Sequence, residues 1–165
     1  MTDSGSSIGH GKGSIYLTLI AAIWLAMIPL PASIDSFRPD WVALAVLYWS
    51  IALPHQIGVL SAWVVGLLMD MMLGSTLGIH ALGMSVIAYI SGTYYHIIRN
   101  SSVWQQSLMM GALIFVSQLL VFWIEHLFAT PRMNPRFLWA AVSSTLVWPS
   151  VYLLLRYIRR RFNIR

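Results

Sequence analysis

Six long apolar blocks, separated by short polar or turn-forming segments, dominate this chain. The length of such blocks indicates how they are buried, because a helix that crosses a bilayer needs about 20 mostly apolar residues. The pattern therefore predicts an all-α membrane protein built as a bundle of about six transmembrane helices. The blocks cover residues 14–28, 41–53, 57–73, 79–98, 105–129 and 137–155.

The first block resembles a secretory signal peptide, since it is apolar and lies near the N-terminus. Its end, Pro29-Leu30-Pro31-Ala32-Ser33, is a poor match to a cleavage site of small residues, and the apolar pattern continues far downstream. We therefore expect the block to remain in the protein as the first helix.

The second block leaves two alternatives open. Only 13 apolar-type residues precede Pro54, which is short for a full span. Counted from residue 37, the segment is long enough, with Pro39 in the first helical turn and Asp40 complementing the helix dipole. Otherwise this helix enters the membrane only partway.

The composition agrees with a lipid environment. Of the 165 residues, 58% are hydrophobic and 9% are charged, whereas a soluble domain carries roughly 25% charged residues. The absence of cysteine excludes a disulfide framework, a thiol nucleophile and a cysteine-based metal site. We expect one compact unit: a disordered lead over residues 1–13, a transmembrane domain over 14–155 and a basic cytoplasmic tail over 156–165.

The basic residues predict the orientation in the membrane, because cytoplasmic loops carry an excess of lysine and arginine. With six spans, one side carries Lys12, Arg99 and the five tail arginines, and the other carries Arg38, Arg132 and Arg136. This division places both termini in the cytoplasm. The tail is expected to face anionic lipid of the bilayer and not nucleic acid.

The fourth block carries a continuous stripe of small residues at alternating spacings of three and four. Small residues let helix backbones approach one another in a membrane. The stripe either packs inside the protein or forms a groove that receives a partner's helix. Its members are Gly78, Ala81, Ser85, Ala88 and Gly92.

The third block places Asp70 on a face of small residues, which includes Gly66 and Gly74 at spacings of four. An ionised carboxylate near the membrane centre costs about 2.5–3.5 kcal/mol, so such residues usually face the protein interior. With the predicted topology, Asp70 lies toward the periplasmic end. It either ends its helix by bonding to hydroxyls such as those of Ser75 and Thr76, or makes an interhelical contact that shapes a binding surface.

The fifth block places Gln118 and Glu125 on one seam, seven residues apart. Gln118 is expected to hydrogen-bond across helices. Glu125 either anchors its helix or has a further role. No pair of carboxylates is brought together by spacing, and the histidines are scattered, so we expect no catalytic residue, no metal site and no cofactor.

Seven short motifs follow one another after about residue 14: FRPDW (37–41), ALPH (52–55), DMMLGSTLG (70–78), MSVIAY (84–89), WQQ (104–106), VFWIE (121–125) and WP (148–149). In this order they resemble the bacterial family of rod shape-determining proteins called MreD. The resemblance covers nearly all of the chain. Two positions depart from the family's pattern, since relatives often have Asn where this chain has Asp40, and some have Asp where it has Gln118.

The resemblance implies a non-catalytic inner-membrane subunit of the cell-elongation complex, which organises sidewall peptidoglycan synthesis and maintains rod shape. The implied direct partner is the single-span protein MreC. Further implied partners are the actin-like MreB, a membrane glycosyltransferase and a penicillin-binding transpeptidase. The alternative is a small-molecule-binding subunit of a membrane transporter, which would need several polar groups around a cavity near the midplane.

A six-helix protein with short loops exposes little surface to water. We therefore expect recognition to occur within the membrane and at the periplasmic helix ends. The residues expected to contact a partner or to pack the helices are Arg38, Asp40, Gly66, Asp70, Gly74, Gly78, Ala81, Ser85, Ala88, Gly92, Gln118 and Glu125.

Overall fold

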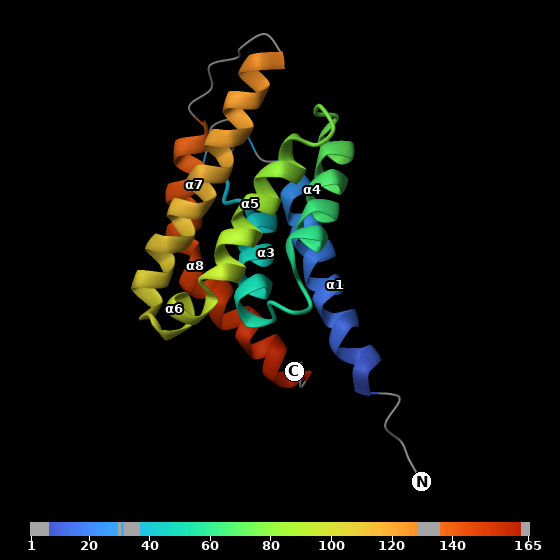
Figure 1. Ribbon diagram of the computed structural model, residues 1–165, viewed down its shortest axis with the longest axis vertical. Helices are drawn as coiled ribbons and strands as arrows, with labels where there is room; N and C mark the ends of the chain where they lie inside the picture. The colour runs from blue at the N-terminus through green and yellow to red at the C-terminus, as the bar shows by residue number, and fades with distance from the viewer. Residues whose placement is uncertain (1–6, 30, 32–36, 129–135, 163–165) are drawn as a thin grey trace.

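The computed structural model describes residues 7–29, 31, 37–128 and 136–162. These residues form seven helices and contain no strand, which confirms the all-helical prediction (Figure 1). The fourth predicted block is divided by a bend at Tyr94 into two helices. The helices are α1 (Ser7–Met27), α3 (Trp41–Ala52), α4 (Val59–Leu73), α5 (Ile79–Thr93), α6 (Tyr95–Asn100), α7 (Val103–Phe128) and α8 (Arg136–Arg161).

Three helix boundaries differ from the expected ones. Helix α1 begins at Ser7, so the second half of the predicted disordered lead is helical. Helix α3 begins at Trp41 with Asp40 as its N-cap, so Pro39 precedes the helix and does not lie in its first turn. Helix α8 continues to Arg161, because the first residues of the basic tail are good helix formers and follow without an interruption.

Helix α3 is the centre of the bundle. All ten residues from Val42 to Ile51 are buried, and α1, α5, α6, α7 and α8 all contact this helix. A helix that is apolar on every side needs protein on every side. With 12 residues it is about 18 Å long, less than the roughly 30 Å of a hydrocarbon core, so residues 37–40 would have to contribute if this segment spans a membrane.

The surface of the bundle is apolar, unlike that of a soluble protein. Large hydrophobic side chains such as Leu60 (75%) and Trp104 (80%) are exposed to the surroundings. Extended apolar surface of this kind is a site of contact with lipid or protein. Among the described residues, Val103–Leu127 is the one helix long and apolar enough to cross a membrane by itself, and four further apolar helices are shorter.

Helices α4 and α5 form the most extensive helix pair, and their two small faces pack against each other. A Cβ atom placed on Gly66 would lie 2.6 Å from the backbone nitrogen of Ala81 and 2.8 Å from the carbonyl oxygen of His80. Ala81 and Ala88 are buried inside the bundle. At these two alanines the stripe on α5 packs inside the protein, which is the first of its two predicted alternatives.

Replacing Gly66 by alanine should destabilise the folded protein by about 1–3 kcal/mol, because the added methyl group would overlap backbone atoms of α5 that cannot rotate away. Thermal unfolding of the purified protein in detergent measures this loss. Gly92→Ala is the matched control, since a Cβ atom at position 92 meets no heavy atom within 4 Å and alanine favours a helix. Equal stability of the two variants would contradict the close contact between α4 and α5.

Candidate functional site

The carboxylate of Asp70 is fully buried at the end of α4 and accepts hydrogen bonds from several donors. The hydroxyl of Ser75 donates to Oδ1 at 2.8 Å, and the backbone N–H of Gly78 donates to Oδ2 at 2.8 Å. His80 donates to Oδ1 twice, from its backbone N–H at 3.1 Å and from its ring Nδ1 at 2.8 Å. The backbone N–H of Ala81 is 3.4 Å from Oδ2.

These bonds explain why α5 can begin where it does. The first N–H groups of any helix lack an intrahelical partner, and Gly78, the N-cap of α5, has no side chain that could accept from them. Asp70 supplies the missing acceptor from the preceding helix, with its negative charge beside the positive end of the α5 dipole. Gly74 ends α4 in the left-handed conformation (φ 64°), which turns the chain back toward that carboxylate.

Asp70 thus combines both of its predicted roles. The hydroxyl of Ser75 is one partner, as expected for a carboxylate that ends a helix. The bonds to His80 are interhelical contacts, as expected for a residue that fixes a surface. His80 itself was missed by the sequence analysis. The sequence feature that could have indicated this contact is the position of His80 in the first turn of α5, ten residues after Asp70.

Asp40 joins three helices at the same end of the bundle. Its Oδ1 accepts from the backbone N–H of Ala43 at 3.0 Å and thereby caps α3, and its Oδ2 accepts from Nε2 of Gln118 on α7 at 2.8 Å. Its backbone N–H donates to the hydroxyl of Ser144 on α8 at 2.9 Å. Gln118 therefore makes the interhelical hydrogen bond that was predicted for it, and its partner is Asp40. The buried Ser144 also belongs to this hydrogen-bonded group, and the sequence analysis missed it.

Asp40 and Gln118 are the two halves of one hydrogen bond. A charge is present on this seam, because the carboxylate of Asp40 reaches it from α3. Arg38 adds a contact to α1, since its Nη2 donates to the carbonyl oxygen of Leu25 in the last turn of that helix at 2.6 Å. A cation near a helix C-terminus complements the dipole.

A cavity of about 210 Å³ lies among these groups. Four polar side chains from three segments line it, namely Arg38, Asp40, His80 and Gln118, together with apolar residues of α1, α3, α4 and α8. We call this region the Asp40 end. Through His80 it also includes Asp70 and the turn that leads from α4 to α5.

The remaining predicted residues lie elsewhere. Glu125 is exposed on α7, two turns beyond Gln118, and Gly92 lies near the opposite end of α5. The hydroxyl of Ser85 donates to the carbonyl oxygen of Ala81 at 2.7 Å, within its own helix. In the described ranges, no three His, Asp or Glu side chains come together as ligands of a metal ion.

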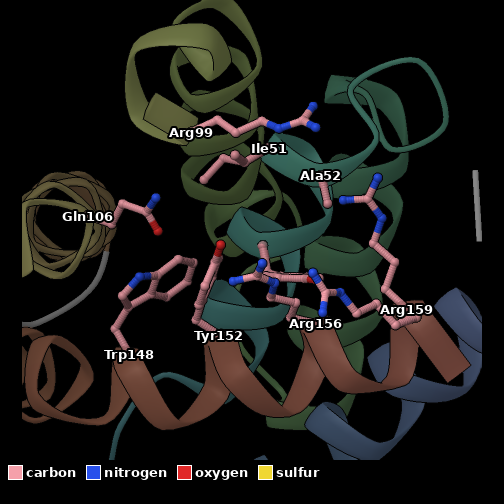
Figure 2. Close-up of a pocket in the computed structure, with 10 residues that line it drawn as sticks. Ile51, Ala52, Arg99, Gln106, Trp148, Tyr152, Arg156 and Arg159 are labelled. Atoms are coloured by element: carbon pink, nitrogen blue, oxygen red, sulfur yellow. The ribbon is translucent and has the colours of Figure 1, made fainter. Parts of the chain in front are cut away.

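A second, larger cavity of about 480 Å³ lies at the opposite end of α3 (Figure 2). Its arginines come from α6 and α8, and the sequence predicted for them a role in topology and, for those of the tail, contact with anionic lipid. The sequence predicted that these arginines lie at helix ends. It did not predict that Arg99 and the arginines of α8, which are more than 50 residues apart in the chain, line the same cavity.

The fold and the Asp40 end define an all-helical protein with an apolar surface, in which buried polar groups hold the helices together. A model of the family of the rod shape-determining protein MreD matches residues 10–158. The chain is also 37% identical over 145 residues to "Rod shape-determining protein MreD" of Haemophilus influenzae, which covers 88% of this chain and 90% of that protein. The chain belongs to the MreD family.

The function of the protein is therefore that of a structural, rod shape-determining protein. The alternative of a small-molecule-binding transporter subunit is not supported, since both matches are to shape-determining proteins. No solved structure matches the chain.

Asp70→Asn should destabilise the protein by about 1–3 kcal/mol, because the amide group would turn donors toward the N–H groups of α5 and leave some of them unpaired. Thermal unfolding in detergent tests this. Glu125→Gln is the matched control, since it makes the same chemical change on an exposed carboxylate and should shift stability by no more than about 0.5 kcal/mol. An Asp70→Asn protein as stable as the control would rule out the capping role.

Proposed function

We propose that the protein is a multi-pass inner-membrane subunit of the cell-elongation complex, with both termini in the cytoplasm. The six spans would be α1, α3, α4, α5 with α6, α7, and α8. The apolar surface and the excess of basic residues at the N-terminal, Arg99 and C-terminal positions support this arrangement. In it, residues 14–155 form the transmembrane domain, and the Asp40 end faces the periplasm.

We further propose that the protein organises sidewall peptidoglycan synthesis without catalysing a reaction itself. It would associate directly with MreC and, through the complex, with MreB, the membrane glycosyltransferase and the penicillin-binding transpeptidase. The family supports a place in the rod shape-determining system.

The observation that carries this proposal is the polar cavity at the Asp40 end. Its polar side chains include Asp40 and Gln118, which are bonded to each other, and His80, which is bonded to Asp70. Groups that are already held in place lose little conformational freedom on binding. On the surface beside them, Met72 is half-exposed and lines the cavity. A single-span partner that leaves the membrane at this end would meet both the cavity and its apolar rim.

The orientation is tested with reporter fusions. A fusion after Arg165 and an insertion between Thr130 and Pro135 should report opposite sides of the membrane, with the C-terminal reporter in the cytoplasm. Both positions must be tested in a protein that still supports rod growth. Reporters on the same side would overturn the six-span arrangement.

Partner docking is tested with Met72→Trp, which should partly fill the cavity and weaken the association with MreC about tenfold, equivalent to about 1.4 kcal/mol. The measurements are co-purification with tagged MreC, corrected for the amount of protein, and the shape of cells that depend on the variant. Met71→Trp is the matched control, because Met71 precedes it on α4, is exposed and does not line the cavity. Unchanged co-purification of Met72→Trp would exclude this cavity as the docking site.

A further inference from the structure

The larger cavity is lined by four arginines from two helices. Arg99 comes from α6, and Arg156, Arg159 and Arg160 come from the last turns of α8. In Figure 2, Arg99 extends over Ile51 while Arg159 rises from α8 toward Ala52, so the two side chains reach the same side of the cavity. None of the described residues that line this cavity is acidic. We call it the arginine cavity.

The wall of the arginine cavity contains a buried donor without an acceptor. Trp148 is 1% exposed, and its Nε1–H has no hydrogen-bond partner in the described part of the chain. Its ring lies between Gln106 and Tyr152 in Figure 2. Buried polar groups of native proteins are almost always paired, so an unpaired indole N–H at a cavity wall indicates a missing acceptor.

Two neighbouring side chains are already held in position. Gln106 donates from Nε2 to the carbonyl oxygens of Ile98 at 3.0 Å and Ser101 at 3.2 Å, which joins α7 to the end of α6. The guanidinium of Arg156 lies over the ring of Tyr152, with Cζ 5.9 Å from the ring centroid. Contacts of this kind orient a guanidinium before a ligand arrives.

The chemistry of this wall selects the ligand. Guanidinium and indole groups only donate hydrogen bonds, so a fitting ligand must offer several acceptor oxygens and negative charge. Phosphate groups meet both conditions and match the planar fork of arginine. We propose that the arginine cavity binds a phosphate group, carried either by the headgroup of an anionic membrane lipid or by a free phosphate ion.

A simpler explanation is that the arginines only set the orientation in the membrane. Orientation requires charge near the helix ends, but it requires neither a cavity of about 480 Å³ nor an unpaired indole N–H in its wall. Arg161 separates the two explanations. It belongs to the same basic turn of α8, is exposed, and does not line the cavity.

The test uses the full chain, purified in detergent and depleted of lipid. Dioleoyl phosphatidylglycerol, dioleoyl phosphatidylcholine and inorganic phosphate are titrated separately at constant ionic strength. Bound lipid is counted by native mass spectrometry, and the unfolding temperature is followed in parallel. We expect phosphatidylglycerol to bind and stabilise the protein more than phosphatidylcholine does if a lipid is the ligand, and inorganic phosphate to stabilise it if the free ion is.

The Arg99→Gln/Arg156→Gln variant should bind that ligand at least about tenfold more weakly, whereas Arg161→Gln should bind it as the unchanged protein does. Trp148→Phe, which replaces the indole by a smaller aromatic ring and removes the N–H, should weaken binding a few-fold. If the double variant is not recovered from the membrane, Arg99→Gln alone takes its place, because Arg99 is exposed on α6.

Equal binding of the two lipids together with no effect of phosphate would overturn the proposal. An equal loss in Arg161→Gln and in the arginine cavity variant would also overturn it, because the effect would then be one of general charge. The test of phosphate binding and the test of MreC docking are independent of each other. The two cavities lie at opposite ends of α3, and the MreC co-purification does not measure lipid binding.

Discussion

The bond network around the carboxylate of Asp70 is the constraint on which the α4–α5 hairpin depends. A buried charge is costly unless it is fully paired, and here the donors come from the hydroxyl of Ser75 and from the start of α5. The same bonds satisfy N–H groups that would otherwise face an apolar environment. This capping brings the start of α5 back to the end of α4. It thereby sets how the two helices are aligned along their axes, so that Gly66 lies against Ala81.

Asp40 repeats this use of a carboxylate at the start of α3. It caps one helix and binds Gln118 on a second, while its backbone N–H binds Ser144 on a third. Apolar side chains gain little by leaving lipid for one another, so close packing and such interhelical hydrogen bonds decide which helices associate. The Asp40 end therefore joins α3 to α7 and α8 and also presents fixed polar groups beside a cavity.

The two ends of α3 differ in chemistry, and the difference follows from the kinds of residue that meet there. At the Asp40 end, carboxylates are matched by the donors of Gln118 and His80, so few groups are left for a charged ligand. At the arginine cavity, donors from α6 and α8 converge, and the part of the chain that the structure describes adds no carboxylate to the lining. The helices are thus held together by paired polar groups at one end, while the other end presents the donors of the proposed phosphate site.

The hydrophobic pattern by itself determined that the chain is helical and where α3, α4 and α7 lie to within about two residues, since long apolar blocks leave few alternatives. It also indicated that Asp70 faces the interior. Only the tertiary structure decided that Asp70 binds His80, that Asp40 binds Gln118 78 positions away, and that Ala81 and Ala88 face the protein's own helices. These contacts depend on how each helix is rotated about its axis. A helix such as α3, buried over every residue from Val42 to Ile51, carries no polar face in its sequence from which that rotation could be read.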